Sequence, residues 1–229
     1  MSLIQTLRLP GPAGPLEAIL KRPAGGSPPF AAVVCHPHPL HGGTMHSKVV
    51  FNVAKALEER GAAVLRFNFR GVGRSGGAHA EGVGEREDVR AALTFLAGLH
   101  PGLPLCLGGF SFGAWVGSAV GCADPRVTQL VAVGTPTRLF DSDALLHCPK
   151  RKLFVQGGAD EHGPAPELAS VVESLAPPKE LRVVEGADHF FSGRTDELRA
   201  VLADYFAREG DPPAPTQIVR GRGPSNSQR

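Results

Sequence analysis

The chain has 229 residues, of which 42% are hydrophobic and 20% charged, values ordinary for a globular protein and sufficient for the core of one α/β domain. Its formal net charge is +2, and residues 211–229, with three Arg and one Asp, account for all of it. That balance excludes a protein that binds the nucleic-acid backbone, which would be clearly basic. No apolar run approaches the roughly 20 residues of a membrane span, and the start Met1-Ser2-Leu3-Ile4 lacks the basic and apolar stretches of a signal peptide.

Strand-like and helical patterns alternate along the chain. Short apolar runs predict strands at residues 16–21, 31–35, 62–69, 104–108, 130–133, 152–155 and 180–184. Apolar residues at helical spacing predict helices at residues 48–60, 85–99 and 165–175 and around 198–205, and the small residues 114–122 predict another. The alternation indicates an α/β fold with a mostly parallel sheet of about seven to eight strands and helices on both faces.

The composition changes at Asp211, after which Pro, Gly, Ser, Asn and Arg dominate without any periodicity. We therefore predict a single domain over residues 1–210 and a disordered tail over residues 211–229. The expected partner is a small molecule, with neither nucleic acid nor membrane involved, and the sequence leaves monomer and homodimer equally open.

Four cysteines occur, at Cys35, Cys106, Cys122 and Cys148, and none belongs to a CxxC pair. The simplest interpretation is that they are free thiols, mostly buried, in a reducing compartment. A cytoplasmic location would follow from it.

The segment Gly109-Phe110-Ser111-Phe112-Gly113 reads G-x-S-x-G and joins a predicted strand to the helix of small residues. A serine in such a turn has a strained backbone and an exposed hydroxyl. Both glycines are needed because a Cβ would collide with the close-packed strand and helix. A free serine is a poor nucleophile, so the motif requires a histidine base and an acid to orient that base.

Candidates for both partners follow in the required order, Asp160 and then His189, each directly after a predicted strand. Ser111 and the histidine-rich loop after Cys35 also follow strands. Because the carboxyl ends of parallel strands meet at one edge of a sheet, we expect these side chains to gather there. Asp188 is too near His189 in sequence to orient it, and we expect it to form hydrogen bonds within the loop.

These features together resemble the α/β-hydrolase superfamily over residues ~15–208, and small lidless bacterial hydrolases near dienelactone hydrolase in particular. Four blocks carry the resemblance: residues 35–46 (CHPHPLHGGTMH), residues 66–75 (RFNFRGVGRS), the serine turn, and residues 186–191 (GADHFF).

The resemblance implies a catalytic set in which Ser111 is the nucleophile, His189 the general base and Asp160 the acid. Asp141 and Asp143 are alternatives for the acid because some relatives take it from that position. The resemblance implies no cofactor and no metal. Residues 134–150, between two predicted strands, are too few for a helical lid, so we expect no cap domain.

The resemblance also implies an oxyanion hole made of two backbone amides. One belongs to the residue after the nucleophile, Phe112. The other comes from the loop that begins at His36, where Pro37 has no N–H to offer. We therefore expect His38 to be the second donor, with Leu40 as the alternative.

The histidines His36, His38 and His41 read H-x-H-x-x-H, a pattern found in metal-dependent hydrolases. Those enzymes have an acid just before the third histidine, whereas this chain has Leu40, and no later loop supplies a complementary set of ligands. We expect the run to form the oxyanion and substrate-positioning loop. A metal-dependent hydrolase remains the alternative.

Residues 71–76 spell G-x-G-x-x-G after a predicted strand, the pattern of a dinucleotide-binding turn. Such a turn requires a helix that starts immediately, but here helical periodicity begins only near Glu85. We expect a glycine-rich loop beside the pocket, in which Arg70 and Arg74 are candidates to contact an anionic substrate group.

The sequence thus predicts a serine hydrolase that cleaves small esters, thioesters or related acyl compounds through an acyl-enzyme. An apolar pocket is expected from four phenylalanines, Phe110, Phe112, Phe190 and Phe191. A non-catalytic binding protein on the same fold is a further alternative, because fold does not fix function.

Overall fold

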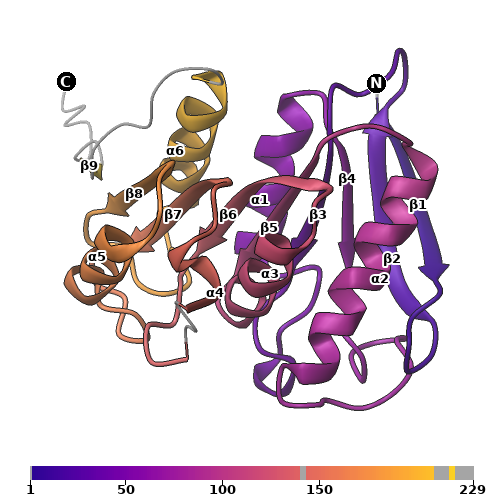
Figure 1. Cartoon of the computed structure of the whole chain (residues 1–229), viewed down its shortest axis with the longest axis horizontal. Helices are drawn as coiled ribbons and strands as arrows, with labels where there is room; N and C mark the ends of the chain where they lie inside the picture. Colours follow the sequence, from indigo (N-terminus) through magenta and orange to yellow (C-terminus); the bar gives the residue numbers. More distant parts are fainter. Residues whose placement is uncertain (1, 140–142, 209–216, 220–229) are drawn as a thin grey trace, which may run out of the picture.

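The computed structural model describes residues 2–139, 143–208 and 217–219. Its strands form one sheet in the order β1-β2-β4-β3-β5-β6-β7-β8-β9 (Figure 1). The strands are β1 (Ser2–Leu9), β2 (Leu16–Pro23), β3 (Ala31–Cys35), β4 (Ala63–Phe67), β5 (Leu105–Phe110), β6 (Val127–Val133), β7 (Arg151–Gly157), β8 (Lys179–Val184) and β9 (Gln217–Val219).

The helices in the described part are α1 (Lys48–Glu59), α2 (Val83–Leu99), α3 (Phe112–Ala123), α4 (Asp143–Leu146), α5 (Ala165–Ser174) and α6 (Thr195–Ala207), with a short 3-10 turn, η1 (Pro39–His41). None of these helices is both long and apolar enough to cross a membrane.

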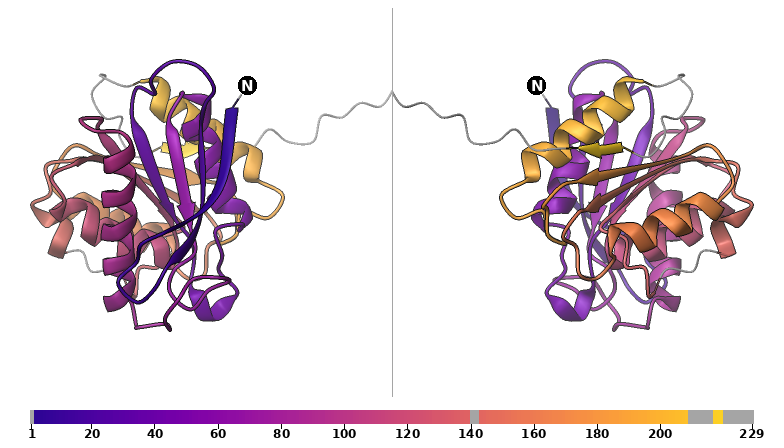
Figure 2. Two further views of the ribbon diagram at one scale, coloured as in Figure 1. Left: turned by 90° about the vertical axis from the view of Figure 1, so that its right-hand side faces the viewer. Right: turned by 90° about the vertical axis from the view of Figure 1, so that its left-hand side faces the viewer.

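The helices cover the two faces of the sheet unequally, α1 and α6 on one side and α2, α3 and α5 on the other (Figure 2). Strand β3 shows why the central strands are short continuous apolar runs. Its Ala32 and Val34 belong to the core under α1 and α6, whereas Ala31, Val33 and Cys35 belong to the core under α2 and α3. A strand covered on both faces needs apolar side chains at every position.

Strand direction decides where functional side chains gather. β1–β2 and β2–β4 are antiparallel, while β4, β3 and β5 to β9 run parallel. Adjacent carboxyl ends are in register, with Cys35 opposite Gly109 and Phe110 opposite Val133. The loops after β3, β5, β6, β7 and β8 therefore meet at one edge. The predicted fold class is confirmed.

The sheet has nine strands in the described part, rather than the seven to eight predicted, because one strand is added at each edge. Most side chains of β1 are exposed, so no apolar run marks it in the sequence. β9 lies within the tail predicted to be disordered and pairs in parallel with β8. The edge of β8 is open to pairing, so this short segment forms a strand there although its composition does not predict one. The rest of that tail, residues 211–216 and 220–229, lies outside the described residues.

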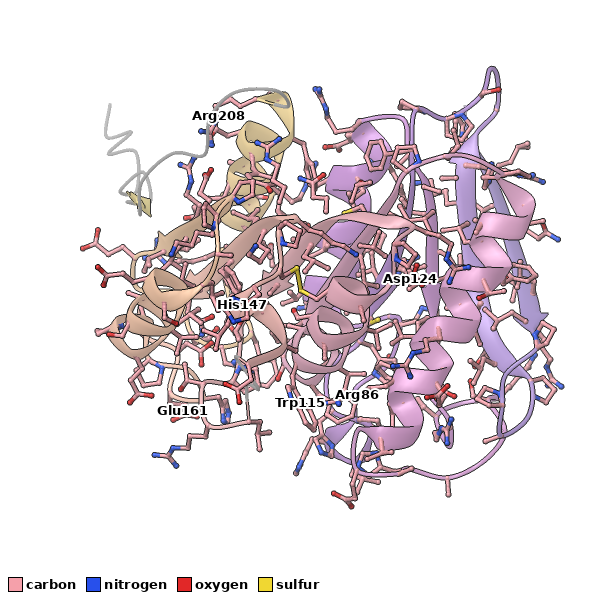
Figure 3. All side chains as sticks on the ribbon, viewed as in Figure 1. Arg86, Trp115, Asp124, His147, Glu161 and Arg208 are labelled. Atoms are coloured by element: carbon pink, nitrogen blue, oxygen red, sulfur yellow. A yellow bond between two sulfur atoms is a disulfide. The ribbon has the colours of Figure 1, made fainter. Side chains whose placement is uncertain are left out.

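The prediction of four free thiols was wrong for two of them. Cys122, near the end of α3, and Cys148, just before β7, form a disulfide with Cα atoms 5.7 Å apart (Figure 3). The fold brings together two residues that are 26 positions apart, a proximity that no spacing pattern encodes. Cys35 and Cys106 are buried and belong to no disulfide among the described residues, and burial raises the pKa of the Cys35 thiol.

Candidate active site

Ser111 lies in a sharp turn between β5 and α3, with φ 55° and ψ −119°. Its N–H donates to the Val133 carbonyl at 2.9 Å, which ties the turn to the neighbouring strand. The flanking glycines are required sterically, because a Cβ on Gly109 would lie 2.3 Å from the Gly113 carbonyl oxygen and one on Gly113 would lie 2.5 Å from the His36 carbonyl oxygen. The positive φ costs about 1–3 kcal/mol and is held by these contacts.

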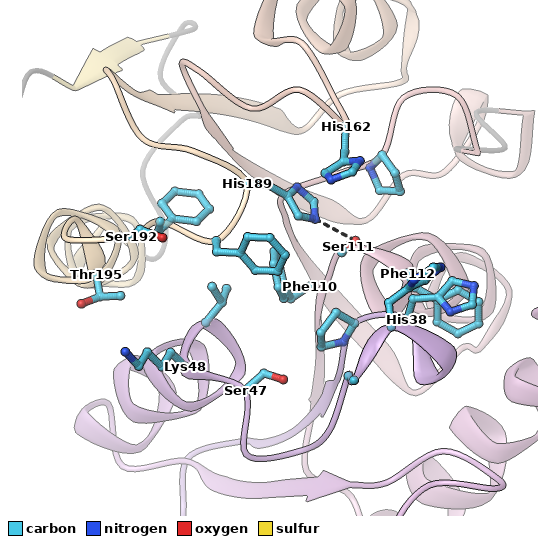
Figure 4. A pocket seen from close by; sticks show the side chains of 18 of the residues that line it. His38, Ser47, Lys48, Phe110, Ser111, Phe112, His162, His189, Ser192 and Thr195 are labelled. Atoms are coloured by element: carbon cyan, nitrogen blue, oxygen red, sulfur yellow. Dashed lines mark hydrogen bonds between the residues drawn. The ribbon is translucent and has the colours of Figure 1, made fainter.

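His189, in the loop after β8, faces the Ser111 hydroxyl. Its Nε2 lies 3.0 Å from Ser111 Oγ, as the dashed line in Figure 4 marks, and its Nδ1 lies 2.8 Å from Asp160 Oδ2. A carboxylate accepts hydrogen bonds, so Nδ1–H donates to Asp160 and the Nε2 lone pair is directed at the serine hydroxyl. The ring is buried between Phe110 and Phe190, with centroids 5.0 and 5.1 Å away.

The Asp160 carboxylate is buried and fully hydrogen-bonded. Besides His189, its Oδ2 accepts from Gln156 Nε2 at 2.8 Å, and its Oδ1 accepts from the amides of His162 at 2.9 Å and Gly163 at 3.1 Å. These donors fix the carboxylate in one orientation, which in turn fixes the imidazole.

The other acids weighed from the sequence are placed differently. Asp188 accepts a hydrogen bond from the Ser192 amide at 2.8 Å, which holds the pKa of Asp188 below its usual range. Asp188 thus forms a hydrogen bond within its own loop, as expected. Asp143 begins α4. Asp141 lies outside the described residues. Of the predicted set, the structure thus brings Ser111, His189 and Asp160 into one chain of hydrogen bonds.

Gln156 and His162 are two site residues that the sequence analysis missed. The Gln156 side chain is fully buried, and besides binding Asp160 it donates to the Gly163 carbonyl at 2.7 Å and accepts from the Thr135 amide at 2.8 Å. It therefore joins the loops after β6 and β7 behind the acid. A polar residue near the end of a buried apolar strand is the signal that could have identified it. The His162 ring packs edge-on against His189, with centroids 4.6 Å apart.

Phe112 and His38 line the same cavity as Ser111, and their backbone amides have no hydrogen-bond partner among the described residues. The alternative donor, the Leu40 amide, is already used because it donates to His38 Nδ1 at 3.2 Å. The His38 carbonyl accepts from His41 and Gly43, which makes the loop rigid. Burial, and then the neighbouring His41 and His79, lower the pKa of His38.

The first histidine of the H-x-H-x-x-H run is not available as a metal ligand. His36 is fully buried, its Nδ1–H donates to the Pro37 carbonyl at 2.6 Å, and its Nε2 accepts from the Phe69 amide at 2.9 Å. Burial lowers the pKa of His36 to about 4, in agreement with this neutral ring. Within the described ranges no group of three or more His, Cys, Asp or Glu side chains is arranged to hold a metal ion.

A cavity of about 930 Å³ opens above Ser111 (Figure 4). Its apolar wall includes the four phenylalanines expected from the sequence, Phe110, Phe112, Phe190 and Phe191. Phe190 is exposed at the rim, whereas the other three rings are buried. The cavity also reaches the starts of α1 and α6, where Lys48 and Thr195 lie.

Comparison with known proteins establishes the family. A family model described as serine aminopeptidase, S33, matches residues 28–145, just over half of the chain. An uncharacterised protein of Rickettsia prowazekii is 36% identical over 206 residues, which cover 86% of each chain. The chain belongs to this family of α/β-hydrolases.

Solved structures of α/β-hydrolases agree with the fold described above. An α/β serine hydrolase homologue from Coxiella burnetii shows 40% identity and a TM-score of 0.83, covering 88% of this chain and 96% of its own. A Xanthomonas campestris protein is described as an α/β serine hydrolase without a lid. It shows 35% identity and a TM-score of 0.83, and the match covers 90% of this chain and 94% of its own. The predicted superfamily is confirmed.

The glycine-rich loop of this α/β-hydrolase does not border the pocket, contrary to expectation. The Arg70 guanidinium is paired with the buried Asp88, at 2.7 Å, and the Arg74 amide donates to Glu17 at 2.9 Å. Neither arginine lines the cavity, since the loop packs against the turn between β1 and β2 instead. The loop also runs on to Gly82 before α2 begins, so it lacks the immediate helix of a dinucleotide site.

Proposed function

We propose that this α/β-hydrolase is a serine hydrolase that cleaves small carboxylic esters, thioesters or related acyl compounds through an acyl-enzyme. The observation that carries the proposal is the hydrogen-bonded chain from Ser111 Oγ through His189 to Asp160 at the floor of an apolar cavity. Nucleophile, base and orienting acid are each within hydrogen-bond reach of the next, as this chemistry requires.

The reaction follows from these positions. Ser111 Oγ attacks the substrate carbonyl carbon while His189 Nε2 takes its proton, and Asp160 stabilises the imidazolium that forms. The Phe112 and His38 amides hold the negative oxygen of the tetrahedral intermediate, each contributing about 2.7–4 kcal/mol. The C–O or C–S bond then breaks, His189 protonates the departing alcohol or thiol, and water cleaves the acyl-enzyme by the same steps.

The proposal is tested first on turnover. We expect the purified protein to hydrolyse 4-nitrophenyl butyrate and a butyryl thioester, with a burst of nitrophenolate in the first turnover, because a good leaving group makes acylation faster than deacylation. Stopped-flow absorbance measures the burst. Activity lost to a chelator and restored by zinc would favour the metal-dependent alternative, and a folded protein that never exceeds the buffer rate would favour a non-catalytic role.

The assignment of the acid is tested by Asp160→Asn. The carboxamide that this substitution introduces would stabilise the wrong tautomer of His189, so kcat is expected to fall about 10⁴-fold while the fold remains intact. Asp188→Asn and Asp143→Asn serve as matched controls and are expected to stay within about threefold of the parent, a margin that allows for small loop effects. If either control lost most of its kcat while Asp160→Asn remained active, the catalytic acid would be that residue and not Asp160.

A further inference from the structure

The end of the cavity farthest from the oxyanion amides is lined by polar and charged side chains. In Figure 4, Lys48, Ser192 and Thr195 lie on the opposite side of Ser111 from His38 and Phe112, with Phe110 between. Lys48 is the first residue of α1, and its side chain extends toward Thr195 at the start of α6. A molecule held at Ser111 therefore passes an apolar wall before it reaches an ammonium group.

Lys48 differs from the other lysines of the chain. The described residues include all six lysines, and for five of them the ammonium group contacts a carboxylate or backbone carbonyls. For Lys48 no such partner exists within the described ranges. Among the described residues that line the cavity, it carries the one permanent charge, and no Asp or Glu lines the cavity with it. Lys48 is exposed, so it presents an unpaired cation where the cavity meets the solvent.

The position of Lys48 in α1 has an electrostatic cost in the empty protein. The start of a helix carries partial positive charge, which favours acidic side chains and disfavours a lysine. α2, α4, α5 and α6 follow this rule with acidic residues in their first turns, whereas α1 and α3 have none. An anion bound at Lys48 would be attracted both by the ammonium group and by the helix start.

We propose that the cavity selects acyl substrates with a second, negatively charged end, such as monoesters of dicarboxylic acids, whose free carboxylate pairs with Lys48. The inference rests on the proposed function and deepens it. The reactive carbonyl lies at Ser111, the methylene chain lies along Phe110 and its neighbours, and the carboxylate lies at the start of α1. Hydrolysis of such a monoester releases an alcohol and a dicarboxylate.

The same charge pattern disfavours peptides with a free amino terminus, although the matching family model is described as serine aminopeptidase. An aminopeptidase must bind an ammonium group, which requires a carboxylate or carbonyls near the nucleophile. The described lining of this cavity contains no Asp or Glu and includes Lys48 and four histidines. We therefore expect aminoacyl 4-nitroanilides to be poor substrates.

The test compares two esters that differ in one charge. Mono-4-nitrophenyl adipate has a free carboxylate, and methyl 4-nitrophenyl adipate has the same chain without it; pimelate and suberate pairs vary the length. Shorter diacids are avoided because their carboxylate attacks its own ester intramolecularly. We expect the wild-type protein to prefer the monoester about tenfold in kcat/KM at the best length, mainly through KM, as for a charged hydrogen bond.

Three variants locate the source of the preference. Lys48→Met is expected to abolish it, and Lys48→Glu to reverse it, while both keep the neutral diester rate within about twofold of the wild type, since Lys48 contacts no reacting atom. Lys55→Met, on the same helix but outside the cavity, is expected to change nothing. Raising the salt from about 10 mM to about 500 mM is expected to weaken the preference.

Equal hydrolysis of the two esters by the wild type, or a preference that survives in Lys48→Met, would overturn the anion subsite and leave the proposed function standing. Cleavage of neither ester would overturn the subsite as well. In that case phosphonate labelling of Ser111 decides the rest: a labelled serine retains the proposed function for other acyl substrates, and an unlabelled one removes both.

Discussion

Ser111→Ala is expected to lower kcat for 4-nitrophenyl butyrate about 10⁶-fold, the scale seen when a serine hydrolase loses its nucleophile. The hydroxyl is the atom that forms the acyl-enzyme, and an alanine in its place leaves only the oxyanion amides and the cavity to act on the substrate. The backbone at residue 111 has a positive φ, which is as unfavourable for alanine as for serine. We therefore expect the melting temperature to change little.

The matched control is Ser192→Ala. Ser192 lines the same cavity and is exposed, and its backbone amide, which donates to Asp188, is kept by the substitution. This variant is expected to retain turnover within a few-fold, as for most exposed positions. Steady-state kinetics on both variants, with circular dichroism to verify folding, measure the difference. Full activity in Ser111→Ala would remove the nucleophile assignment.

His189→Ala is expected to cost a similar factor, about 10⁶ in kcat. Without the imidazole, no group accepts the Ser111 proton or returns it to the leaving group. The variant also leaves the buried Asp160 carboxylate without one of its donors, although Gln156 and the amides of His162 and Gly163 still hold it. The fold should therefore survive.

His162→Ala separates the base from its neighbour. His162 stacks edge-on against His189 but is half exposed and lies beyond hydrogen-bond reach of Ser111 in the described contacts. We expect it to reduce kcat less than about tenfold, because it acts only by packing and solvent exclusion. A loss in His162→Ala equal to that of His189→Ala would show that the base assignment is incomplete.

The fold was predictable because its signals are local. Each central strand is covered on both faces, so β3, β5 and β7 appear as short apolar runs, and α1 carries a regular apolar stripe. The edge strands were not predictable in the same way. β1 exposes most of its side chains, and β9 takes its pairing from β8 rather than from a pattern of its own.

The proximity of Ser111, Asp160 and His189 was equally predictable, since each follows a strand and parallel strands end at one edge. What the sequence could not provide depends on contacts across the fold. Gln156 supports Asp160 from inside a buried strand, and the Cys122–Cys148 disulfide joins distant segments. Arg70 was a candidate to contact an anionic substrate group, but its guanidinium pairs with Asp88 on α2.

The positively charged residue that lines the cavity was likewise not predictable from the sequence. From the sequence, the arginines of the glycine-rich loop were the candidates for an anionic substrate group. In the structure that loop packs against the β1–β2 turn, while the start of α1 and the start of α6 line the cavity. Lys48 belongs to no recognisable sequence motif. Its proposed role in substrate binding follows only from the position of α1 relative to Ser111.

The central claim, that His189 and Asp160 activate Ser111, is tested most directly by labelling with a fluorophosphonate followed by intact mass measurement. The account predicts a single adduct on the wild-type protein, located on Ser111 by peptide mapping, and no adduct on Ser111→Ala. Folded wild-type protein that takes up no label, or labels equally in Ser111→Ala, would contradict it.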